Sequence, residues 1–194
     1  RASRTSIRGQ IVAPPLPSLL REIGKRQINR APSPVLAMSV PWLLVMMGSL
    51  TPTWPVIASA PVMPPLGFLL LVAWQQLRPG LFPVWAGLPL GLFDDLYSGQ
   101  PMGSAVVLWS AAMLGLDFIE LRFPWRGFVL NWLEASGFIA AYLILSLQIA
   151  NLGGGSTQLT AILPQVLLAI LTYPIAGRLV GLADRFRLIK IRAV

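Results

Sequence analysis

Two adjacent carboxylates, Asp94 and Asp95, are the side chains of this sequence best suited to chemistry. They lie in the stretch GLPLGLFDDLYSGQPMG, residues 87–103, of a 194-residue chain that is 55% hydrophobic and 11% charged. Acid–base catalysis, cation binding and a structural contact are all roles that such a pair can have. Which role applies depends on how the surrounding helices place the two carboxylates.

Catalysis by an aspartyl dyad needs a second carboxylate about 3 Å away, so that the two groups share one proton. Asp117 is the candidate partner, but we expect it about 15 residues along the following helix, which at about 1.5 Å per residue is over 20 Å away. The sequence therefore argues against an intramembrane aspartyl protease. Because the chain has no cysteine and no histidine, thiolate, zinc and Ser-His-Asp chemistry are excluded. We expect no enzymatic activity, no cofactor and no metal site.

Cation binding by Asp94 and Asp95 alone is a weak prediction, because adjacent residues of a helix point about 100° apart. A structural contact fits the sequence better. Residues 98–101, Ser-Gly-Gln-Pro, end one helix shortly before the next begins. The free N–H groups and positive end of that next helix attract an anion. We therefore expect Asp95 to bond to the first turn of the following helix and to join the two helices.

Glycines at four-residue spacing predict close contacts between helices. Gly87 and Gly91 lie on the helix that carries the aspartates, and Gly99 and Gly103 lie across the turn that follows it. We expect a neighbouring backbone to approach the first two closely. The remaining pair with this spacing, predicted to contribute to helix packing near the end of the chain, is Gly177 and Gly181.

Long stretches without charge predict an integral membrane protein. Residues 31–77, 79–93 and 135–177 contain no Asp, Glu, Lys or Arg. A soluble domain carries about 25% charged residues, and about 20 apolar residues suffice to cross a bilayer. The predicted fold is all-α with six membrane-spanning segments: 35–50, a second ending within 75–79, then 79–98, 102–118, 128–150 and 159–182, the last kinked at Pro174.

The basic residues predict the orientation of these segments. When the six segments are threaded with the N-terminus inside, all 15 Lys and Arg residues fall on one side of the membrane. Lys and Arg concentrate in cytoplasmic loops, so the sequence predicts that both termini are cytoplasmic. The net charge of +8 is then explained without nucleic acid as a partner.

The predicted six-helix domain covers residues 31–184 and lies between two basic tails, 1–30 and 185–194. Within the first tail, residues 16–30 have the spacing of an amphipathic helix at the membrane surface; a disordered tail is the alternative. Since the first 30 residues are polar, we expect no cleavable signal peptide. Prolines within 52–65 indicate either a loop or a re-entrant segment before the second span.

Polar residues inside the predicted spans favour one intramembrane ion pair. Glu134 lies about six residues into the fifth segment, roughly 9 Å from its start. An ionisable residue at that depth is a functional candidate by default. We favour a pair with Arg178 of the sixth segment, with Asn131 one turn earlier as the alternative partner.

The run GLFDDLYSGQPMG resembles the G-L-x-x-D-L-x-x-G-x-x-x-G motif of the bacterial rod shape-determining protein MreD family. The matching positions are Gly91, Asp95, Gly99 and Gly103, and Asp94 is a local addition. The length and hydrophobic profile are similar to the family's from about residue 34 onward.

Two shorter matches accompany this motif. Trp74, followed by Pro79, is similar to the family's Tyr-Trp…Arg-Pro sequence at the end of the second helix, with Ala73 in place of tyrosine. Pro174 stands where the family often has Trp-Pro, with Tyr173 in place of tryptophan.

The resemblance implies a non-enzymatic scaffold in the bacterial inner membrane that maintains rod shape. Its implied partners in the cell-wall elongation complex are MreC, RodA, a class B penicillin-binding transpeptidase and the filament MreB, besides membrane lipid. The implied six-helix fold is similar to that of the substrate-binding subunits of energy-coupling-factor transporters. That fold leaves an alternative function open, a transporter subunit for a small solute or lipid, whose pocket would be lined by Asp94, Asp95, Tyr97 and Gln100.

Overall fold

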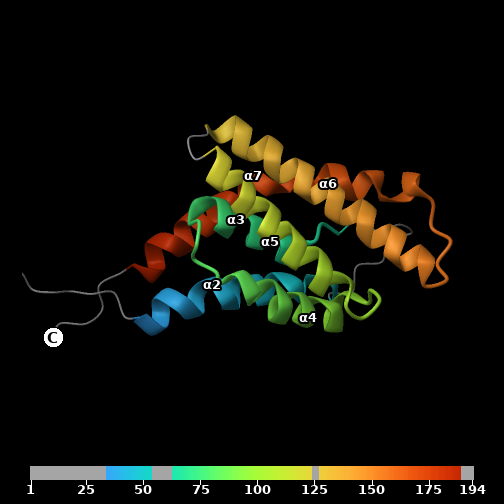
Figure 1. The fold of residues 1–194 in the computed structure, drawn as a ribbon, viewed down its shortest axis with the longest axis horizontal. Helices are drawn as coiled ribbons and strands as arrows, with labels where there is room; N and C mark the ends of the chain where they lie inside the picture. The colour runs from blue at the N-terminus through green and yellow to red at the C-terminus, as the bar shows by residue number, and fades with distance from the viewer. Residues whose placement is uncertain (1–33, 54–62, 124–126, 189–194) are drawn as a thin grey trace, which may run out of the picture.

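The computed structural model describes residues 34–53, 63–123 and 127–188, and within them it is a bundle of six α-helices without strands (Figure 1). The prediction of an all-α fold is confirmed for these residues. The helices are α2 (Pro34–Ser49), α3 (Leu66–Leu77), α4 (Gly87–Ser98), α5 (Ser104–Arg122), α6 (Phe128–Leu152) and α7 (Leu163–Arg187). Three short 3₁₀ segments adjoin them: Thr51–Thr53, Val84–Ala86 and Leu159–Ile162.

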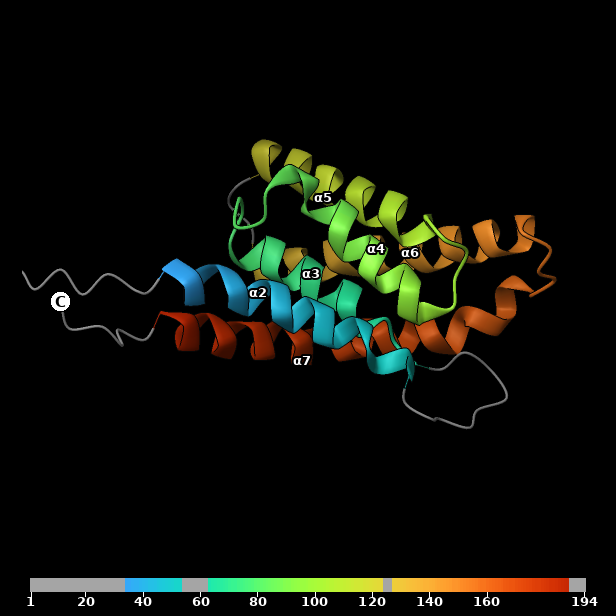
Figure 2. The same ribbon diagram turned by 90° about the horizontal axis from the view of Figure 1, so that it is seen from below.

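Helix α3 lies at the centre of the bundle and packs against α2, α5, α6 and α7 (Figure 2). Every residue from Gly67 to Gln75 is buried. A helix that is apolar on all sides has to be covered on all sides, and the run LGFLLLVAW meets that condition. The core of the molecule therefore forms around α3, with Phe68, Trp74 and Trp109 among its largest fully buried side chains.

The helices alternate in direction, so their basic ends gather at one end of the bundle. The start of α2 and the end of α7 lie together there, as do the end of α3, the end of α5 and the start of α6 (Figures 1 and 2). We call this the basic end, because it carries Arg78, Arg122 and Arg187. The turn between α4 and α5 lies at the opposite end, which we call the hairpin end.

Three of the helices are long and apolar enough to cross a membrane: α5, α6, and the 29-residue stretch Leu159–Arg187 that ends with α7. The others are shorter, with 16 residues in α2 and 12 each in α3 and α4. At 1.5 Å per residue a 12-residue helix is about 18 Å long, against a hydrocarbon core of about 30 Å. Three helices are thus candidates to cross a membrane by length and composition, and the count of six remains a prediction.

Several predicted boundaries were wrong, and proline and glycine explain the largest error. The third segment does not begin at residue 79: Pro79 and Gly80, whose φ is +77°, form a turn, and α4 starts only at Gly87. Proline cannot continue the ladder of a preceding helix, and a positive φ at Gly80 excludes helical geometry. Residues 63–65 lead directly into α3, whose N-cap is Pro65.

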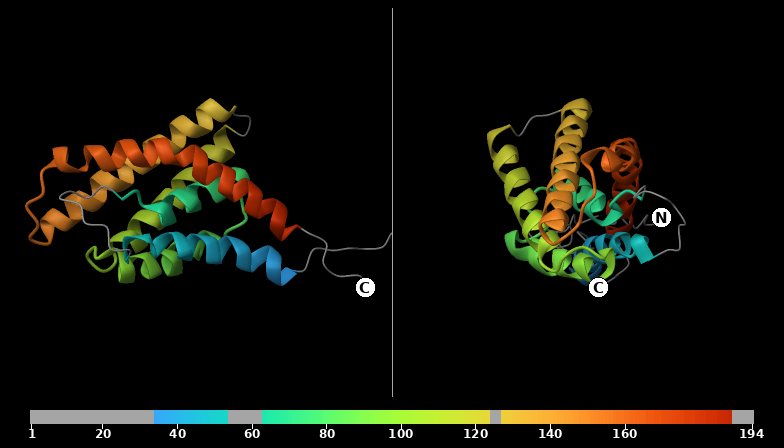
Figure 3. Two further views of the ribbon diagram at one scale, coloured as in Figure 1. Left: turned by 180° about the vertical axis from the view of Figure 1, so that it is seen from behind. Right: turned by 90° about the vertical axis from the view of Figure 1, so that its right-hand side faces the viewer.

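The last helix runs beyond the predicted end of the membrane domain at residue 184, to Arg187. Pro174 lies inside it, and the ribbon of α7 bends midway along its length, as expected for an internal proline (Figure 3). The predicted amphipathic helix of residues 16–30, residues 189–194 of the predicted C-terminal tail and residues 54–62 lie outside the described residues.

Candidate functional site

Asp95 joins the end of α4 to the beginning of α5. Its Oδ2 accepts hydrogen bonds from the N–H groups of Gly103 at 2.8 Å and Val106 at 3.4 Å. Its Oδ1 accepts from the N–H of Ala105 at 2.9 Å and from the hydroxyl of Ser104 at 3.1 Å. One carboxylate thus satisfies several of the backbone donors that a helix leaves free in its first turn. This is the contact expected from the sequence, and it leaves Asp95 with no free lone pair aimed at a substrate.

Four glycines make this hairpin possible. A Cβ on Gly91 would lie 2.7 Å from the carbonyl oxygen of Ala105 and from the backbone of Val106, and a Cβ on Gly87 would lie 2.8 Å from the Cα of Ser110. The helices α4 and α5 are therefore packed backbone to backbone, as the glycine spacing predicts. Two further glycines, Gly99 and Gly103, have φ values of +69° and +94° and make the turn between the helices.

Asp94 points elsewhere. It is buried, and the hydroxyl of Tyr142 on α6 donates to its Oδ2 at 3.5 Å. The two neighbouring carboxylates thus serve different helices and do not converge on one ion. Within the described ranges, no group of three or more His, Cys, Asp and Glu is arranged to hold a metal.

The candidate protease dyad does not form. The carboxylate of Asp117, near the end of α5, accepts a hydrogen bond from the amide of Gln75 on α3. Asp95 instead contacts the start of α5, and the 11 or more residues between these positions span about 16 Å of helix. Tyr97, one of the side chains expected to line a solute pocket beside Asp95, is 43% exposed. The geometry therefore favours neither the dyad nor that pocket lining.

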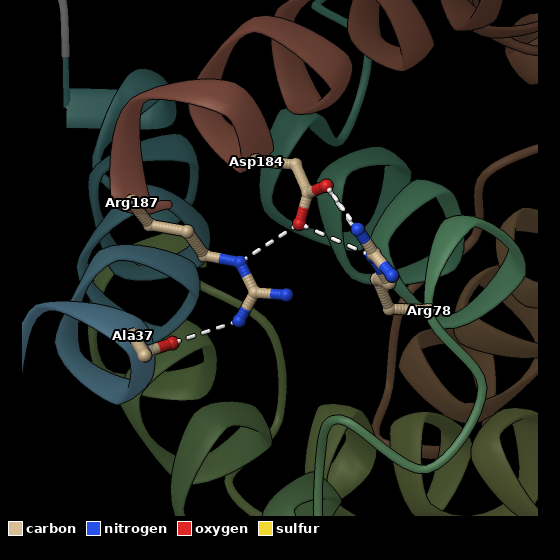
Figure 4. Close-up of polar contacts among 4 residues, drawn as sticks. All are labelled: Ala37, Arg78, Asp184 and Arg187. Carbon is tan, nitrogen blue, oxygen red and sulfur yellow. Dashed lines mark hydrogen bonds and ion pairs between the residues drawn. The ribbon is translucent and has the colours of Figure 1, made fainter. Parts of the chain in front are cut away.

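At the basic end, Asp184 holds two arginines and thereby connects three helices (Figure 4). Its Oδ2 lies 2.9 Å from Arg78 Nη2, and its Oδ1 lies 2.8 Å from Arg187 Nε. Arg187 also donates from Nη1 to the carbonyl oxygen of Ala37 on α2, at 2.9 Å. Its guanidinium lies 5.4 Å from the ring centroid of Trp74. The cluster ties α2, the end of α3 and α7 together.

Sequence reasoning missed this cluster, which we call the Asp184 cluster. A signal was present, because Asp184 is the one acidic residue of the basic C-terminal part and stands three positions before Arg187, a spacing that brings helical side chains together. Arg78 is 49% exposed, and its hydrogen bond to Asp184 raises the pKa of its guanidinium above the ordinary value. Arg187, in contrast, is buried.

The ion pair predicted between Glu134 and Arg178 is not among the salt bridges of the described residues. Gln76 of the central helix reaches Glu134 instead: its Nε2 lies 2.9 Å from Glu134 Oε2 and 2.9 Å from the carbonyl oxygen of Asn131. Its Oε1 accepts the hydroxyl of Tyr173 at 2.6 Å. One amide therefore connects α3, α6 and α7. Among the described residues the salt bridges use Arg78 and Arg187, and none uses Arg178.

Beside this amide lies a groove between α3, α6 and α7, with a volume of about 340 Å³. It was not expected from the sequence. Its walls combine aromatic, small and polar side chains. The residues lining it are Ala73, Gln76, Leu77, Phe128, Asn131, Trp132, Tyr173, Pro174, Gly177 and Arg178.

The predicted packing role of Gly177 and Gly181 was also wrong. A Cβ placed on either glycine would meet no atom within 4 Å. Gly177 instead widens the groove. Four-residue glycine spacing permits close helix contact but does not bring a partner helix to that face, and here α3 and α6 pack elsewhere on α7.

The three weaker motif residues have separate positions. Trp74 is fully buried on α3 beneath Arg187, Pro79 is exposed in the turn after α3, and Pro174 lies on α7 in the wall of the groove. They do not converge on one site. Comparison of the chain with protein-family models, with curated proteins and with solved structures finds no match.

Proposed function

We propose that this protein is a non-enzymatic scaffold of the bacterial inner membrane that binds MreC and organises peptidoglycan synthases in the cell-wall elongation complex. The observation that carries the proposal is the Asp95 hairpin. The glycines and the aspartate of the family-like motif each have an architectural role in it: Gly91 allows close packing, Asp95 joins two helices, and Gly99 and Gly103 form the turn. A motif whose one carboxylate and whose glycines are used in helix contacts supports a structural rather than a catalytic role.

The proposed topology has six crossings and two cytoplasmic termini. It is supported by the gathering of Arg78, Arg122 and Arg187 at one end of the bundle, since basic residues concentrate on the cytoplasmic side. The short helix α3 does not contradict six crossings. Other helices surround it and every residue from Gly67 to Gln75 is buried, so protein rather than lipid covers α3 itself.

The outer surface of the bundle supports membrane embedding. On α7, a stripe at four-residue spacing is exposed: Leu167 at 61%, Leu171 at 67% and Ile175 at 67%. Exposed apolar side chains in such a contiguous row require lipid or a partner helix as their surroundings. We propose that MreC and the membrane-bound synthases RodA and the class B transpeptidase, together with MreB, are members of the complex that this chain organises, as its resemblance to the MreD family implies.

The test is co-purification from the source bacterium in mild detergent. We expect MreC to be recovered with the wild-type chain and to be lost with Gly91→Leu, because a side chain there forces α4 away from α5. Gly137→Leu is the matched control: it also adds a leucine to a membrane helix, but a Cβ at Gly137 meets no atom within 4 Å.

Depletion of the chain should convert rods into spheres, and expression of the Gly137→Leu variant should restore rods while Gly91→Leu should not. Rods that persist after clean deletion, or MreC recovered equally with both variants, would contradict the proposal.

A further inference from the structure

The groove between α3, α6 and α7 lies between two of the helices that are long enough to cross a membrane. It is open on the outside of the bundle, where Phe128 is 71% and Leu77 is 44% exposed. A groove of about 340 Å³ in such a place is not left empty, because close packing is the normal state of protein and lipid interiors alike. The question is what fills it.

Three polar side chains at the groove, Gln76, Tyr173 and Trp132, are already bonded within the protein. Gln76 uses its amide for Glu134, the backbone carbonyl of Asn131 and Tyr173, and the indole N–H of Trp132 donates to the carbonyl oxygen of Ile170 at 3.2 Å. A small polar solute would have to displace these bonds. An apolar chain, in contrast, would contact the aromatic and aliphatic walls without disturbing any of them.

One charged side chain at the groove remains available for a ligand. Arg178 is exposed, lines the groove, and takes part in none of the salt bridges between described residues. It lies nine residues before Arg187 on α7, about 13 Å along the helix from the basic end. The arginine side chain is long enough to keep its methylenes in the apolar region while its guanidinium reaches a polar head group. The planar fork of donors matches a phosphate.

We propose that the groove binds an anionic phospholipid, with one acyl chain between α6 and α7 and its phosphate on Arg178. The groove matches both parts of such a lipid: its apolar walls suit the acyl chain, and the guanidinium of Arg178 suits the phosphate. The inference rests on the membrane placement of α6 and α7 and not on the scaffold function, so the two are tested by different measurements.

The experiment is native mass spectrometry of the full chain in detergent, titrated with palmitoyl-oleoyl phosphatidylglycerol or with phosphatidylcholine carrying the same chains. We expect tighter binding of the anionic lipid. Arg178→Gln should weaken phosphatidylglycerol about fivefold and leave phosphatidylcholine unchanged. Gly177→Leu fills the groove and should weaken both lipids.

Two matched controls use the same helix. Gly181→Leu adds a leucine one turn away, where a Cβ meets no atom within 4 Å and no groove is lined. Arg185→Gln removes an exposed arginine that does not line the groove. Both should bind like the wild type. All four variants should also unfold at the wild-type temperature, since neither glycine has a neighbour and both arginines are exposed.

The proposal is overturned if Gly177→Leu binds both lipids like Gly181→Leu, or if Arg178→Gln and Arg185→Gln weaken phosphatidylglycerol equally. It is likewise overturned if the purified chain retains a peptide or a non-lipid molecule that Gly177→Leu displaces. If lipid binding fails these tests while MreC still co-purifies, only the lipid site is refuted. If MreC does not co-purify while lipid binds as expected, only the scaffold proposal is refuted.

Discussion

The carboxylate of Asp95 accepts the backbone N–H of Ala105 at 2.9 Å, and this contact joins the last turn of α4 to the first turn of α5. A single acidic side chain thereby acts as an N-cap for a helix other than its own. Its bonds to Gly103 and Ser104 make the same connection. Stability of the hairpin is therefore expected to depend strongly on this one carboxylate.

Replacing Asp95 by alanine should lower the free energy of unfolding by about 2 kcal/mol, because buried donors at the start of α5 lose their acceptor. Thermal unfolding in detergent would measure the loss. The control is Tyr97→Phe, two residues further along at an exposed position; it keeps the ring contact with Phe93 and should have little effect. Equal stability of the two variants would mean that the carboxylate does not support the hairpin.

Replacing Gly91 by alanine should destabilise the protein by about 1–3 kcal/mol, since the new methyl group would lie 2.7 Å from the backbone of α5 and overpack the contact. Gly137→Ala on α6 should be neutral or stabilising, because alanine is the better helix former by about 1 kcal/mol and nothing lies near it. Chemical unfolding of both variants compares them directly. A loss at Gly137 as large as at Gly91 would refute the backbone contact.

In the Asp184 cluster the two arginines should differ. Arg187→Ala should cost about 3 kcal/mol or more, because it leaves a carboxylate without its buried partner and removes the bond to Ala37. Arg78→Ala should cost much less, because Arg78 is half exposed and its pair is screened by solvent. Double-mutant cycles with Asp184→Asn measure both couplings. A larger coupling for Arg78 than for Arg187 would contradict this assignment.

Gln76 should contribute more to the stability of the fold than a single uncharged side chain usually does. Gln76→Leu should destabilise the protein more than Tyr173→Phe, for which we expect about 1 kcal/mol, because Tyr173 makes one of the three bonds that Gln76 makes. Thermal unfolding of both variants gives the comparison. Equal losses would show that the bonds to α6 contribute nothing to stability.

The proposed orientation can be mapped because the chain has no cysteine, so that each introduced cysteine is unique. Ser156→Cys, in the loop between α6 and α7, should react with a membrane-impermeant maleimide in intact cells. Leu188→Cys, just after α7, should react only after the inner membrane is opened. Labelling of Leu188→Cys in intact cells would show that the orientation is the reverse of the proposed one. The proposed function would then lose the support that the orientation gives it.

Composition and local pattern were enough to predict much of this protein. Uncharged runs predicted an all-α, membrane-type chain, because no soluble surface can be built from so few charges. The closeness of Asp95 to the start of the next helix predicted their contact, and the spacing of Gly87 and Gly91 predicted a backbone against them. These are relations between two helices that follow each other directly in the chain, and the short turn between them leaves few ways for the helices to meet.

Only the tertiary structure decided the contacts between distant segments. Glu134 accepts a hydrogen bond from Gln76 of α3, Asp184 binds both Arg78 and Arg187, and Gly177 lines a groove instead of a helix contact. The physical reason is that a helix sequence determines which residues share a face, whereas the neighbour of that face depends on how six helices pack at once around α3. The charge and size of each side chain allowed several contact partners, and the packing of the helices determined which of these partners it meets.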